Sequence, residues 1–60
     1  MSKRKARPGD TIVIIGTPDN GRPANVVQTE DGYRVLARVI ETNNLDWFGA
    51  DQWRHLDGAE

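Results

Sequence analysis

Residues 9–16 read GDTIVIIG, and they are followed by PDNG at 18–21 and by ANVVQ at 24–28. The first stretch holds four consecutive β-branched apolar residues, which suits a strand that is covered on both faces or bent across a barrel. The PDNG stretch supplies the residue types that form tight turns, and the third stretch is again rich in β-branched residues. This order of strand, turn and strand predicts the opening of a very small all-β barrel.

A third strand is expected over residues 33–40, after a tight turn in which Gly32 takes a left-handed conformation at little cost. The residues of this strand alternate between two faces. We expect the inward set to be Tyr33, Val35, Ala37 and Val39, and the outward set to be Arg34, Leu36, Arg38 and Ile40.

The remaining apolar residues form two groups, at 45–48 and 53–56, separated by GADQ at 49–52. We expect a strand, one turn of 3₁₀ helix and a last short strand. The alternative is a helix capped by Asn44 and running to His55. Glycine within such a helix would cost about 1 kcal/mol, and the two tryptophans do not fall on its apolar face.

A length of 60 residues is enough for one domain. We expect a disordered basic tail at 1–8, a five-stranded barrel at 9–57 and a frayed end at 58–60. A domain of this size buries only about 60% of the surface that its unfolded chain exposes. The chain has no cysteine, so disulfides and cysteine-bound zinc are excluded. Barrel closure or self-association must therefore stabilise the fold. We accordingly expect the protein to be a monomer or a homodimer.

The formal net charge of −1 is unevenly distributed along the chain. Four of the eight basic residues lie within the first seven positions, which leaves four basic against nine acidic residues in the rest, a balance of −5. The four are Lys3, Arg4, Lys5 and Arg7. A mobile segment of this kind can bind a nucleic acid backbone with salt-sensitive, largely sequence-independent affinity.

The chain as a whole resembles a small SH3-like β-barrel. Its opening, from Gly9-Asp10 through Asn20-Gly21 to the valines at 26–27, is similar to that of KOW-type domains. The second half resembles that family in its order of strands and turns alone. The chain is also similar to small SH3-like proteins of unknown function from actinobacteria and their phages. It departs from the KOW pattern at Pro23-Ala24, where a glycine is usual, which weakens any transfer of a ribosomal or transcription-factor role.

No catalytic, cofactor-binding or metal-binding residues are predicted. The only serine is Ser2 and the only imidazole is His55, so a catalytic triad cannot be assembled in the usual way. Carboxylate pairs such as Asp46 and Asp51 are interpreted as solvent-facing and turn-forming groups. Phosphate loops, dinucleotide fingerprints and calcium loops are absent from the sequence. We expect a non-enzymatic binding module without a cofactor.

The favoured partner is a nucleic acid or a nucleoprotein complex. Aromatic rings beside cations form platforms for single-stranded nucleic acid, although at least two of the four rings must build the core. We expect Trp47 or Trp53 to be partly exposed and Arg34 and Arg38 to flank the contact face. The predicted contact residues are Lys3, Arg4, Lys5, Arg7, Arg34, Leu36, Arg38, Trp47 and Trp53.

The alternative is a module, or an inhibitor encoded by a phage or plasmid, that binds a host protein. SH3-like barrels dock extended segments on aromatic grooves and can accept a strand at an open edge. The outward Leu36 and Ile40 form a mixed apolar and basic stripe with the arginines. The acidic balance of residues 8–60 also opposes nucleic acid and favours a basic partner.

The sequence predicts a cytoplasmic protein. No apolar stretch follows the basic residues at 3–5, so a signal peptide is not expected. No apolar run approaches the length that spans a bilayer, so no membrane partner is expected.

Overall fold

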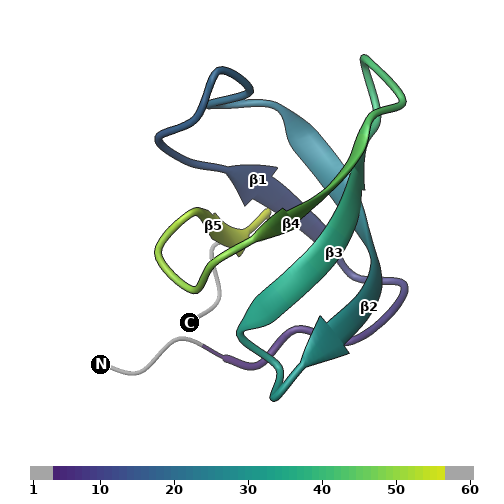
Figure 1. The fold of residues 1–60 in the computed structure, drawn as a ribbon, viewed down its shortest axis with the longest axis vertical. Helices are drawn as coiled ribbons and strands as arrows, with labels where there is room; N and C mark the ends of the chain where they lie inside the picture. The colour runs from purple at the N-terminus through teal and green to yellow at the C-terminus, as the bar shows by residue number, and fades with distance from the viewer. Residues whose placement is uncertain (1–3, 57–60) are drawn as a thin grey trace.

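The computed structural model describes residues 4–56. It contains five strands and no helix in that part of the chain, which confirms the predicted all-β class (Figure 1). The strands are β1 (Thr11–Ile14), β2 (Pro23–Glu30), β3 (Arg34–Val39), β4 (Leu45–Phe48) and β5 (Trp53–His55). Accordingly, none of the described residues forms a helix that could cross a membrane.

All five strands belong to one antiparallel sheet in the order β4-β3-β2-β1-β5. The first strand lies inside the sheet and pairs with β2 on one side and β5 on the other. The long strands β2 and β3 curve along their length (Figure 1). Their register shifts between Val26 and Gln28, which leaves Val27 as a bulge residue. Bulges of this kind increase local twist and bend a sheet.

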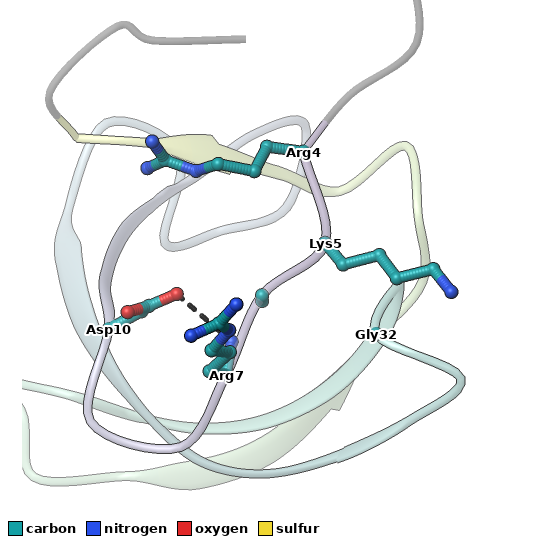
Figure 2. Close-up of a pocket in the computed structure, with 6 residues that line it drawn as sticks. Arg4, Lys5, Arg7, Asp10 and Gly32 are labelled. Atoms are coloured by element: carbon teal, nitrogen blue, oxygen red, sulfur yellow. Dashed lines mark hydrogen bonds between the residues drawn. The ribbon is translucent and has the colours of Figure 1, made fainter.

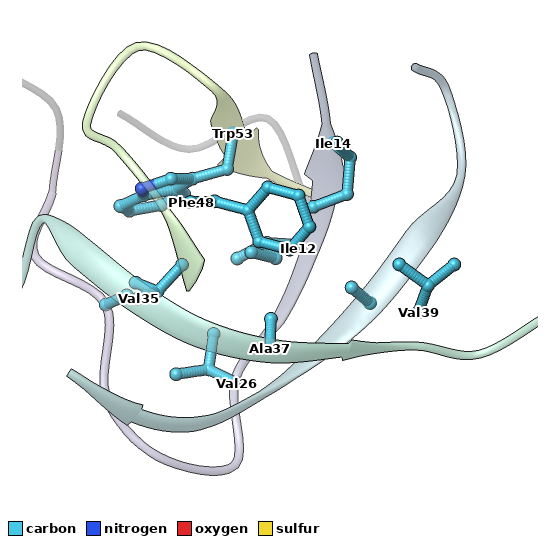
Figure 3. Packing of buried hydrophobic residues seen from close by; sticks show 10 residues of the cluster. Ile12, Ile14, Val26, Val35, Ala37, Val39, Phe48 and Trp53 are labelled. Carbon is cyan, nitrogen blue, oxygen red and sulfur yellow. The ribbon is translucent and has the colours of Figure 1, made fainter. Parts of the chain in front are cut away.

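The core lies inside this curl, where β1 contributes Ile12 and Ile14 (Figure 3). Ile12, Val13 and Ile14 are all buried, as expected for a strand covered on both faces. The alternation predicted for the third strand is also confirmed. Its inward residues Val35, Ala37 and Val39 are buried, with Tyr33 packed at the margin of the core. The outward Arg34, Arg38 and Ile40 are exposed and Leu36 is half-buried.

The turn between β2 and β3 has the backbone conformation that its sequence predicts. Asp31 and Gly32 have φ angles of 53° and 86°, the signs of a type I′ turn, for which Asp-Gly is a preferred pair. The amide of Tyr33 donates to the carbonyl of Glu30 at 3.3 Å and closes the turn.

The segment between the last two strands is a single hydrogen-bonded turn, and the expected turn of 3₁₀ helix is not assigned there. The amide of Gln52 donates to the carbonyl of Gly49 at 3.0 Å. The side-chain oxygen of Gln52 accepts from the amide of Gly49 at 2.9 Å. These reciprocal bonds close the chain on itself and return it directly to β5. The expected order of strand, turn and strand is confirmed against the helical alternative.

The expectation of a disordered tail at 1–8 is wrong for residues 4–7, which we call the strap. Ala6 is only 3% exposed and belongs to the core cluster, and its amide donates to the carbonyl of Gly32 at 2.8 Å. The carbonyl of Arg4 accepts a hydrogen bond from Nε2 of His55 at 2.7 Å. A small apolar residue between basic ones thus anchors the segment. Lys3 and the end predicted to fray at 58–60 lie outside the described residues.

Candidate functional site

The outer surface of β3 and β4 brings together four of the predicted contact residues. The register pairs Leu36 with Trp47 and Arg38 with Leu45 across the two strands. Because side chains alternate along a strand, these residues and Arg34 point to the same side, away from the core. We call this surface the Trp47 face, and it consists of Arg34, Leu36, Arg38, Leu45 and Trp47.

Arg34 is positioned by two neighbours on this face. Its guanidinium carbon lies 5.2 Å from the centroid of the Trp47 ring, within the range of a cation–π contact. Its Nη1 atom is 3.1 Å from Oε1 of Glu30, which is its register partner on β2. Both members of this ion pair are largely exposed, so it adds little stability and yields readily to another anion.

The rest of the face combines one more cation with aliphatic surface. Arg38 is exposed and lies opposite Leu45, which is 48% exposed. Ile40 follows the end of β3 and is 51% exposed. The Trp47 ring itself is partly buried. The arrangement therefore offers an aromatic surface with an arginine on it, a second arginine and an apolar margin.

Trp53 does not belong to this face, and its prediction as a contact residue is wrong. It is fully buried among the core residues (Figure 3). Its Nε1 donates to the carbonyl of Tyr33 at 2.6 Å. The ring also meets that of His55 edge-on, with centroids 5.1 Å apart. Alternation along β5 turns Trp53 and His55 inward and Arg54 outward. Phe48 is buried as well, so Trp47 is the outward ring of β4.

The strap holds the other described cations of the predicted site. Arg4, Lys5 and Arg7 are exposed and line a pocket of about 600 Å³ together with Ala6, Asp10 and Gly32. The side chains of Arg4 and Lys5 point in opposite directions from the strap (Figure 2). Nζ of Lys5 lies 6.0 Å from the centroid of the Tyr33 ring.

The turn that leads from the strap into β1 is fixed by Asp10. Its Oδ2 accepts from the amide of Arg7 at 2.9 Å, and its own amide donates to the carbonyl of Arg7 at 3.0 Å. The pocket that carries the cations therefore also holds one carboxylate. A second pocket of about 240 Å³ adjoins it and is lined by Arg4, Asp10, Thr11, His55 and Leu56.

His55 on β5 is a buried structural residue that holds the strap. It is 1% exposed. Since a carbonyl can only accept, Nε2 of His55 carries the hydrogen that it donates to Arg4. Sequence reasoning missed this anchor, although Ala6 is the one apolar residue among the basic ones and could have signalled it.

The predicted contact residues thus fall into two groups. The strap packs against Gly32, Tyr33 and His55, whereas the Trp47 face lies on the outside of β3 and β4. Within residues 4–56 no cluster of three or more histidines and carboxylates could hold a metal ion. Comparison with protein families, curated proteins and solved structures finds no match for this chain. Stacking and charge pairing are the chemistry that these two groups can supply.

Proposed function

We propose that the chain is a non-enzymatic, SH3-like binding module that contacts single-stranded nucleic acid through the Trp47 face. The SH3-like part of the proposal is supported by the five-stranded antiparallel sheet and by the glycine-containing opening of the sequence. The site part is carried by one observation, the contact of Arg34 with the partly exposed ring of Trp47.

A base stacks on Trp47 in this proposal. Stacking on an aromatic side chain contributes about 1–3 kcal/mol per base and tolerates any base. Arg34 already lies against the ring, and Arg38 is exposed on the same face, so phosphates on either side of the stacked base meet a cation. The arrangement has an energetic cost, because the ion pair of Arg34 with Glu30 must break before Arg34 can contact a phosphate.

The strap cations have a secondary role. Arg4, Lys5 and Arg7 are exposed on a segment whose backbone is anchored at Ala6, so they are fixed rather than trailing. They add charge to a molecule whose remaining residues are acidic overall. They contribute affinity through release of counterions, without base preference.

The test is a titration of labelled oligo(dT) and oligo(U) of about 12 nucleotides, within the site sizes of small barrels. Fluorescence anisotropy measured between about 50 and 200 mM salt gives both affinity and its salt dependence. Trp47→Ala should weaken binding roughly 5- to 150-fold, the equivalent of about 1–3 kcal/mol. Arg38→Gln should lower the slope of log affinity against log salt by about 0.7.

Arg54→Gln is the matched control, because Arg54 is an exposed arginine on a strand at the other end of the sheet. It should change neither the affinity nor the salt slope as much as Arg38→Gln. Failure of both oligonucleotides to bind wild-type protein at the lowest salt would contradict the proposal. So would equal losses for the two arginine variants.

A second candidate is a protein partner that is acidic and apolar at its contact surface. The exposed Leu45 and Ile40 favour it, because aliphatic side chains offer burial rather than stacking. A probe peptide of alternating glutamate and leucine, with a lysine and leucine peptide as control, distinguishes the two candidates. Binding of the acidic peptide that Leu45→Ser abolishes, without oligonucleotide binding, favours the protein partner.

A further inference from the structure

The outer edge of β4 could pair with another strand, but the side chain of Asp46 lies at it. Within the described chain β4 is the last strand of the sheet and pairs with β3 alone. An edge strand presents unpaired amides and carbonyls, which form a template for another strand. The four residues of β4 are long enough to begin such pairing.

The amide of Trp47 shows how this edge is arranged. It donates to Oδ1 of Asp46 at 2.8 Å, so its partner is a neighbouring side chain and not β3. Antiparallel pairs alternate between those that exchange backbone hydrogen bonds and those that do not. The amide of Val39 donates to the carbonyl of Asn44 at 2.8 Å, so this pair is of the first kind. Alternation along the register makes the pair of Leu36 and Trp47 one of the second kind, so the amide of Trp47 faces the outer edge.

Asp46 has an unusual position for a carboxylate. Its register partner is Ala37, which is fully buried on the inner side of the sheet. Asp46 is exposed nevertheless, because it lies on the edge strand. Charged residues on the inner side of an edge strand are one means by which natural sheets avoid edge-to-edge aggregation.

We propose that the side chain of Asp46 prevents another strand from pairing with the outer edge of β4. Its carboxylate occupies the Trp47 amide, which an incoming strand would need as a donor. The carboxylate can only accept hydrogen bonds, so it also repels the carbonyl that would approach this amide. The strand that this edge fits once Asp46 is removed is β4 of a second copy, paired antiparallel about a two-fold axis.

The hydrogen bond itself is measurable in the wild-type protein. A through-bond NMR coupling between the Trp47 amide nitrogen and the side-chain carboxyl carbon of Asp46 is expected. A coupling from that amide to a backbone carbonyl carbon of β3 instead would overturn the proposal, whatever the variants do.

The functional test is sedimentation velocity at rising protein concentration. Wild-type protein should show no association through β4, while Asp46→Ala should shift towards a dimer. Hydrogen exchange should then slow at the Leu45 and Trp47 amides of the variant as its concentration rises. Asp46→Asn should associate less than Asp46→Ala, since the amide oxygen still accepts from Trp47 although the charge is removed.

Asp51→Ala is the charge control, because Asp51 is exposed in the turn after β4. It removes the same charge without touching the edge and should leave the oligomeric state unchanged. The proposal is overturned if Asp46→Ala stays monomeric with unchanged exchange. It is equally overturned if the Asn and Asp51 variants associate as strongly as Asp46→Ala. None of these results depends on nucleic acid binding.

Discussion

Two separate constraints require a glycine at position 32. Its φ of +86° lies in the left-handed region, which other residues enter only at a cost. A Cβ at this position would also lie 2.8 Å from Cβ and Cγ of Lys5. Because Cβ of Lys5 is tied to the backbone, the strap would have to move to make room. The turn and the strap are therefore coupled through this residue.

Gly32→Ala should destabilise the fold through both constraints. The backbone conformation alone costs about 1–3 kcal/mol, and the contact with Lys5 adds to it. Gly21→Ala is the matched control, since Gly21 has a φ of +87° with nothing within 4 Å of an added Cβ. Urea unfolding of both variants separates the two costs. An equal loss of unfolding free energy in the two variants would show that the strap does not press on Gly32.

The strap is attached to the sheet by a few local contacts. A buried alanine and hydrogen bonds to Gly32 and from His55 hold residues 4–7 against the sheet. Each such hydrogen bond contributes about 0.5–1.5 kcal/mol net. The five strands do not depend on it for their pairing. A substitution of Ala6 by a residue whose side chain cannot be buried is therefore expected to detach the strap locally.

Ala6→Asp should detach the strap rather than unfold the sheet. The loss is limited to the attachment of the strap, about 1–3 kcal/mol on the same accounting. Hydrogen exchange should accelerate at the Ala6 amide and stay slow in β1 and β2. Ala50→Asp, the same substitution at an exposed alanine, should leave exchange unchanged. Uniform acceleration across all five strands after Ala6→Asp would contradict this view of the strap.

Elements with a periodic pattern were predictable from the sequence. The alternation of β3 identifies its inward and outward residues, and the Asp-Gly pair at 31–32 identifies its turn. The strap was missed, because a single alanine among basic residues is a weak signal that carries no periodicity. The distinction between Trp47 and Trp53 was also hidden. Strands of three and four residues are too short for alternation to assign an inward face.

At the scale of the whole molecule, a small core depends heavily on a single side chain. A chain of 60 residues has an unfolding free energy of about 3–9 kcal/mol at typical values per residue. Trp53 is the largest fully buried side chain, and it packs against the core from β5. Trp47 lies outside this core on β4. The two tryptophans therefore differ in place: Trp53 lies in the core, and Trp47 lies on the face for which we propose binding.

Trp53→Ala should leave little folded protein. Removing a buried tryptophan costs about 3–5 kcal/mol, which takes most or all of the available stability. Trp47→Ala should keep the fold, and its loss of unfolding free energy should be smaller than that of Trp53→Ala. Far-ultraviolet circular dichroism and amide dispersion in NMR spectra measure both variants. A folded Trp53→Ala protein beside an unfolded Trp47→Ala protein would reverse the assignment of core and surface.

The central claim is that a base stacks on the ring of Trp47. One measurement tests this claim directly. The two indole N–H signals are followed by NMR while oligo(dT) is added to the wild-type protein at low salt. The Trp47 signal should shift together with the amides of Arg34, Leu36 and Arg38. The Trp53 signal should stay in place, since its N–H is bonded to Tyr33 inside the core. No shift of the Trp47 signal at saturating oligonucleotide, or shifts confined to the strap, would contradict the account.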